Sequence, residues 1–66
     1  MLSSRKIIQL LQAEGWYHVG TVGDHYQFRH PERPGKVTVP HPQKDLCLEL
    51  VKSIERQSGV RLRKRS

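Results

Sequence analysis

The apolar residues near the start of the chain recur at the spacing of an amphipathic helix. Ile7, Leu10 and Leu11 fall on one side of such a helix, and Ser3 is a favourable N-cap residue ahead of them. Gly15 is suited to the left-handed conformation that commonly ends a helix. The pattern therefore predicts a helix that begins just after Ser3 and ends before Gly15.

From residue 16 onward the sequence changes to aromatic and β-branched residues, which favour strands. The pattern predicts strands at 16–22, 25–30 and 36–39. Gly23 and Asp24 form a turn pair between the first two strands. A loop is expected over 31–35, because this segment holds Pro31, Pro34 and Gly35. Short connections favour an antiparallel meander.

Apolar residues return to helical spacing between residues 46 and 54. Asp45 is the expected N-cap of this second helix, and Gly59 followed by Val60 is expected to end it. The order is therefore αβββα. We expect an α+β fold, with a three-stranded antiparallel sheet and both helices on one face.

The formal net charge is +6, from 12 Lys and Arg residues against 6 Asp and Glu residues. Four of these positive charges lie near the C-terminal end, at Arg61, Arg63, Lys64 and Arg65. This balance favours a polyanionic partner such as RNA or DNA. A solvated basic tail that only aids solubility explains the charge equally well.

A chain of 66 residues allows one domain with a thin core. Any active site is therefore expected to be shallow, which suits a polymeric substrate. The one cysteine, Cys47, has no internal disulfide partner, and no apolar run approaches the ~20 residues that span a membrane. We expect a cytoplasmic protein without a membrane segment.

Strict alternation along the strands predicts which side chains share a face of the sheet. The core face is expected to carry the larger apolar residues, Tyr26, Phe28, Val37 and Val39. The opposite, open face is then expected to carry polar and basic residues, namely His25, Gln27, Arg29, Lys36 and Thr38.

A histidine grouped with cations suits the chemistry of a phosphodiester. Imidazole exchanges protons near neutral pH, and Arg29 and Lys36 can stabilise the charge of a phosphorane. The alternative is that His25 is only a polar residue on the wet side of the sheet. His41, between two prolines, is rigidly presented but has no acid–base partner nearby in the sequence. His18 and His30 are weaker candidates.

The sequence predicts no metal site and no cofactor. The four histidines are not paired at i, i+2 or at the helical i, i+4 spacing. Asp24 is the one acidic residue beside a histidine. Because neighbours on an extended chain point to opposite sides, the side chains of Asp24 and His25 are expected to diverge rather than form a dyad.

Several segments together resemble the HicA toxin family: Gly15–Trp16, Gly23–Pro31, Pro34–Pro42, Lys44–Leu46 and Val51–Ile54. The resemblance covers nearly the whole chain up to Gly59. We therefore expect a HicA-like toxin domain over 1–59 and a basic C-terminal tail over 60–66. The resemblance also implies a fold like that of the double-stranded-RNA-binding domain.

The resemblance further implies ribonuclease activity against mRNA, one essential histidine after a Gly-Ser turn, and neutralisation by a HicB-type antitoxin. That histidine corresponds to His25. Asp24 stands where the family usually has serine, and its negative charge would repel a phosphate.

The sequence thus predicts a toxin that acts as a metal-independent endoribonuclease. His25 would act as general acid or base while a ribose 2′-hydroxyl attacks the adjacent phosphate. Five residues would bind the RNA: Arg29, Lys36, Gln27, Thr38 and His41. The alternatives are a non-catalytic RNA-binding module of the same fold, or a protein-binding domain whose basic surface meets an acidic partner.

Overall fold

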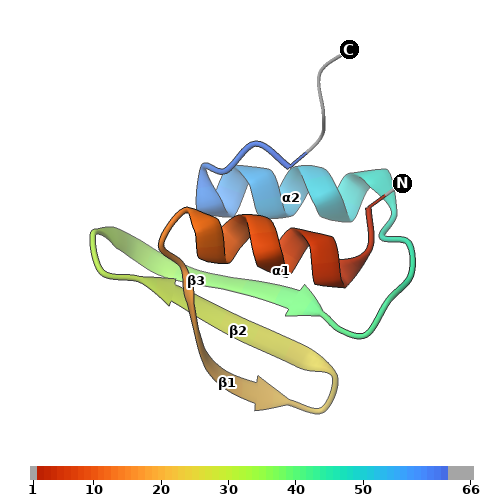
Figure 1. Ribbon diagram of the computed structural model, residues 1–66, viewed down its shortest axis with the longest axis horizontal. Coiled ribbons are helices and arrows are strands. Elements are labelled where there is room, and N and C mark those ends of the chain that lie inside the picture. Colours follow the sequence, from red (N-terminus) through yellow and green to blue (C-terminus); the bar gives the residue numbers. More distant parts are fainter. Residues whose placement is uncertain (1, 63–66) are drawn as a thin grey trace.

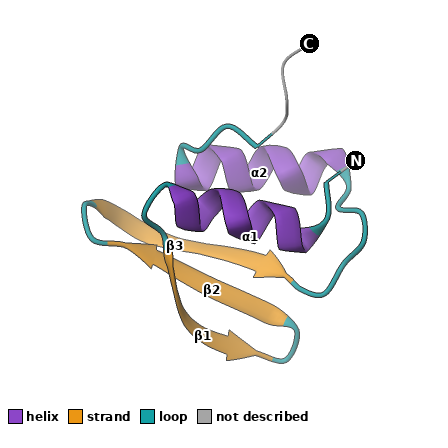
Figure 2. Cartoon of the chain, viewed as in Figure 1, coloured by secondary structure: helices purple, strands orange, loops and turns teal. Residues whose placement is uncertain are grey.

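The computed structural model describes residues 2–62 and has the order αβββα (Figure 1). Its elements are α1 (Ser4–Ala13), β1 (Tyr17–Val22), β2 (His25–His30), β3 (Arg33–Pro40) and α2 (Leu48–Ser58). The strands form one antiparallel sheet in the order β1-β2-β3. Both helices lie on the same side of this sheet (Figure 2). The predicted α+β fold is confirmed.

Helix α1 begins and ends where local signals predict. Ser3 is its N-cap, and the Lys6 backbone N–H donates to the Ser3 hydroxyl over 3.1 Å. The helix stops at Glu14, and Gly15 follows with φ of 99°. This backbone conformation is one that residues other than glycine rarely adopt.

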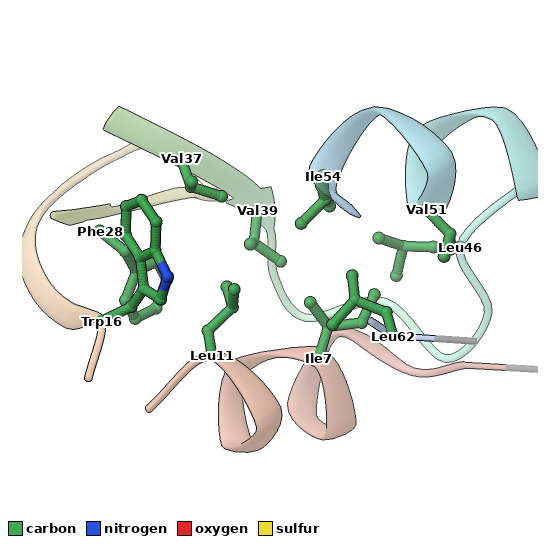
Figure 3. Close-up of a cluster of buried hydrophobic side chains, with 10 residues drawn as sticks. All are labelled: Ile7, Leu11, Trp16, Phe28, Val37, Val39, Leu46, Val51, Ile54 and Leu62. Carbon is green, nitrogen blue, oxygen red and sulfur yellow. The ribbon is translucent and has the colours of Figure 1, made fainter. Parts of the chain in front are cut away.

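The core lies between the sheet and the two helices (Figure 3). Phe28, Val37 and Val39 contribute from the sheet, as predicted, and each is at most 1% exposed. The other buried apolar side chains come from both helices and the segments around them: Ile7, Leu11, Trp16, Leu46, Val51, Ile54 and Leu62. Tyr26, expected in the core, is only partly buried and packs against its margin.

The expectation of a loop over 31–35 is wrong. β3 already begins at Arg33, which pairs with His30, so the β2–β3 connection is only residues 31–32. Pro34 is accommodated because β3 is an edge strand and its pairing with β2 is irregular between Arg33 and Val37. The predicted third strand, 36–39, lies inside the longer observed one.

The predicted N-cap at Asp45 is also wrong, because α2 starts later, at Leu48, after Cys47. Leu46 reaches the core from the loop before the helix and is 5% exposed. Its backbone N–H donates to the Leu2 carbonyl over 2.9 Å. That hydrogen bond holds the segment in an extended conformation, so α2 begins at a later residue. The end of α2 at Gly59, with φ of 75°, is confirmed.

The chain after α2 folds back on the core. The Leu62 side chain is 3% exposed, and its backbone N–H donates to Glu55 Oε2 over 2.8 Å. Most of the predicted basic tail, residues 63–66, lies outside the described residues. In the described part of the chain, neither helix has the length and apolar character needed to cross a membrane.

The pairing of β1 with β2 contains an irregularity at Val19. Tyr17 and His18 pair with Arg29 and Phe28, whereas the next pair joins Gly20 to Gln27. Val19 is therefore an extra residue without a partner, as in a β-bulge. From Gly20 to Val22 the alternation of β1 is shifted by one position relative to Tyr17.

Candidate functional site

The predicted polar residues gather on the open face, which is the side of the sheet away from the helices. Gln27 lies at the centre of this face, paired with Gly20 on β1 and Thr38 on β3. His25 and Arg29 lie at either side of it along β2. Directly paired residues point to the same face, so Thr38 joins them. The expected positions of these four residues are confirmed.

Lys36 is the remaining residue predicted for this face. It is exposed and directly precedes Val37, which is fully buried against the helices. The β2–β3 pairing is irregular here, since residues 34–36 stand opposite Arg29 alone, so strict alternation does not place the Lys36 side chain and its position stays a prediction. The open face thus combines one imidazole with an amide, a hydroxyl and the Arg29 guanidinium.

His25 has an exposed side chain beside a carboxylate. Its Nε2 lies 3.6 Å from Oδ1 of Asp24, and the two side chains are 59% and 67% exposed. The expectation that they diverge is wrong, because Asp24 belongs to the turn and strand alternation does not apply to it. An ion pair this exposed contributes little to stability. It does place a negative charge next to the imidazole.

His41 is separated from the other predicted RNA-binding residues. Its ring is on the helix side, where Nδ1 lies 2.6 Å from the Ser4 hydroxyl oxygen and the ring meets the Tyr26 ring edge-on at 4.8 Å. Ser4 is 1% exposed. His41 borders a surface hollow with Arg5 and Lys44, so a contact with RNA phosphate there stays a prediction.

The side chains of two other histidines, His30 and His18, make contacts with neighbouring residues. Nδ1 of His30 accepts the Glu32 backbone N–H over 3.0 Å. The proton of a neutral His30 is therefore on Nε2, which donates to the Glu14 carbonyl over 2.9 Å. His18 stacks on Tyr26 at 5.0 Å, on the helix side. Within residues 2–62, His25 is the one histidine on the open face.

The structure adds three residues of β1 that strict alternation does not group together. Tyr17 pairs with Arg29, Gly20 with Gln27, and Val22 with His25, so all three face the open side. Without the bulge at Val19, Tyr17 and Val22 would point in opposite directions. The only sequence signal was Gly20 itself, since glycine inside a strand often marks a bulge or a close approach.

The described residues contain no group of three or more His, Cys, Asp or Glu side chains that could hold a metal ion. This finding concerns only the ligands that the folded chain brings together. Metal-independent chemistry therefore stays a prediction, to be tested directly.

Comparison with known proteins identifies the family. Residues 4–60 match the family model described as the HicA toxin of bacterial toxin–antitoxin systems. A solved structure described as a HicA3 and HicB3 toxin–antitoxin complex contains a similar chain, with a TM-score of 0.77 and 26% identity, over 94% of this chain and 100% of that one. No curated protein sequence matches. With the family model spanning most of its length, this chain belongs to the HicA toxin family of toxin–antitoxin systems.

Proposed function

We propose that this HicA toxin is a metal-independent endoribonuclease that cleaves mRNA, with His25 as the catalytic residue. One observation carries the proposal: His25 shares the open face with Arg29, Gln27 and Thr38. The other described histidines contact Ser4, Thr21 or the Glu14 carbonyl instead. An accessible imidazole on a face that also carries a cation suits acid–base cleavage of RNA.

The proposed reaction uses the ribose 2′-hydroxyl as nucleophile. The 2′-oxygen loses its proton to a base and bonds to the adjacent phosphorus, and the bond from phosphorus to the 5′-oxygen breaks. The leaving 5′-oxygen takes up a proton, and a 2′,3′-cyclic phosphate remains. His25 supplies one of these proton transfers. Arg29 and Lys36, further along the sheet, are assigned to the phosphate backbone of the bound RNA.

Gln27 and Thr38 offer neutral hydrogen-bonding groups at the centre of the same face. We assign them contacts with the ribose and phosphate of bound RNA, because an amide and a hydroxyl can both donate and accept. His41 would contact a more distant phosphate from the other side of the sheet. Its neighbours Arg5 and Lys44 supply positive charge there.

The proposed activity is tested by incubating the purified protein with labelled RNA and with DNA of the same sequence, with and without a chelator. We expect RNA to be cleaved to cyclic phosphate ends in both conditions, and DNA to stay intact because it lacks the 2′-hydroxyl. Activity that disappears with chelator and returns with zinc or magnesium would refute metal independence. RNA binding without cleavage would favour a non-catalytic RNA-binding module. A protein that neither binds nor cleaves RNA would favour the protein-binding domain.

Asp24→Ser is expected to increase cleavage. The Asp24 carboxylate lies beside His25 and repels an approaching phosphate. A unit charge at about 4 Å in water corresponds to roughly a fivefold change in rate. The cleavage rates of parent and variant are compared at low and at high salt. The increase in rate of the variant over the parent should be smaller at high salt, because salt screens the charge. Equal or lower activity would mean that Asp24 usefully holds the imidazole or the turn.

We also propose that a HicB-type antitoxin is the partner and that the toxin acts in the cytoplasm, where mRNA is found. The support is that the similar HicA3 chain was solved together with HicB3. A shallow site on an open sheet is most simply inhibited by a protein that covers it. An antitoxin that presents carboxylates would complement Arg29 and Lys36.

A further inference from the structure

We infer that the open face holds one unstacked RNA base against the Tyr17 ring, above the bare backbone of Gly20. The inference rests on the proposed function and makes it more specific, since it names a base-binding position and the form of RNA that fits it.

Gly20 is not explained by its own backbone conformation or by packing against its neighbours. Its φ is outside the left-handed region that glycine alone adopts readily, unlike that of Gly15 or Gly59. A Cβ added at Gly20 would meet nothing within 4 Å. Glycine inside a strand also costs stability relative to alanine. Neither a left-handed conformation nor packing therefore requires it, which leaves the bulge at the adjacent Val19 and a close approach by another molecule as reasons for a glycine here, of which we take the second.

The missing side chain leaves bare backbone on the open face of the edge strand β1, a position that we call the trough. Gly20 pairs with Gln27, which also pairs with Thr38. On β1 the trough is bounded by Tyr17 at one end and Val22 at the other, and these side chains are 49% and 67% exposed. A flat, apolar object with polar edges fits between them.

A nucleobase has these properties. Aromatic side chains bind bases by stacking, and the interaction tolerates any base because each has a π-face. Arg29, which pairs with Tyr17, is placed to neutralise the phosphate of the same nucleotide. The Gln27 amide can donate to and accept from the edge of the base. The charge of the open face thus favours RNA over an apolar protein segment.

The position relative to His25 defines the substrate. Arg29 lies four residues from His25 along β2, about 14 Å at the usual rise of a strand. The base on Tyr17 therefore belongs to a nucleotide that flanks the cleaved phosphate. Bases that can stack on side chains are those already splayed out of a helix. The preferred substrate is single-stranded or locally unpaired RNA.

The experiment measures the affinity of full-length protein, carrying His25→Ala to prevent cleavage, for single-stranded RNA containing 2-aminopurine. Tyr17→Leu should weaken binding roughly 5- to 150-fold and relieve the quenching of 2-aminopurine, whereas Tyr17→Phe should retain both. Gly20→Val should weaken binding comparably, yet leave the Tm unchanged or up to ~8 °C higher. The control is Thr21→Val, which adds no bulk on the open face.

The outcomes separate this inference from the proposed function. If the protein neither binds nor cleaves RNA, the proposed function fails. If it binds RNA and both Gly20→Val and Tyr17→Leu bind as tightly, the base position is wrong while the proposed function stands. If the two variants weaken only the binding of the antitoxin, the trough is part of the antitoxin interface and not of the RNA site. If Gly20→Val lowers the Tm, the glycine is structural and this inference is overturned.

Discussion

Replacing His25 by alanine should reduce RNA cleavage by roughly 10²- to 10⁴-fold and abolish growth arrest, without unfolding the protein. The rate falls because the variant loses the one imidazole that the described chain presents on the open face. The fold is retained because the His25 side chain is 59% exposed and outside the core. Cleavage rates and Tm, measured on the same purified samples, test the loss of activity and the retention of the fold.

His18→Ala is the matched control. Its imidazole is also exposed, but it stacks on Tyr26 on the helix side of the sheet. This variant should cleave RNA at nearly the parental rate. A folded His25→Ala protein that cleaves as fast as the parent would exclude His25 as the catalytic residue, and equal losses in the two variants would point to a structural effect.

A saturating amount of HicB-type antitoxin should displace RNA from the toxin completely. If the antitoxin covers the open face, RNA and antitoxin compete for Arg29 and Lys36, and no complex contains all three molecules. The measurement is a titration of antitoxin into labelled RNA bound to the His25→Ala toxin, followed by size-exclusion chromatography. A stable complex of toxin, RNA and antitoxin would show that the antitoxin binds another surface, such as the helices.

Paired charge variants locate the shared surface independently. Arg29→Ala should weaken RNA binding and slow association of the antitoxin, since complementary charge mainly accelerates encounter. Lys52→Ala, which removes an exposed cation from α2, should change neither. Association rates measured at two salt concentrations distinguish a loss of charge from a loss of contact.

The elements that sequence predicted well are those controlled by neighbouring residues. The Ser3 cap, the turn at Gly23 and the left-handed Gly59 each depend on a local conformation that one residue type favours. The failures depended on distant partners. Pro34 fits in β3 because that strand is at the edge of the sheet and is irregularly paired there, and Leu46 stays out of α2 because its backbone N–H donates to the Leu2 carbonyl.

The candidate site shows the same division. Strict alternation placed His25, Gln27 and Arg29 correctly because the extra residues in both pairings lie on β1 and β3, not on β2. It could not group Tyr17 with Gly20 and Val22 on that face, since their grouping depends on the unpaired Val19 within β1. It also could not predict that His41 turns toward α1, because the hydroxyl that it meets lies 37 residues earlier in the chain.

The burial of Leu62 bears on where the folded domain of this small toxin ends. The family model matches residues 4–60, whereas the last described core side chain belongs to residue 62. A fragment cut at the end of that match would therefore lose a side chain that closes the hydrophobic interior. In a domain of this size a buried leucine is worth a large part of the total stability. Boundaries for fragments and fusions of this protein should therefore follow the packed interior, with residues 60–62 kept.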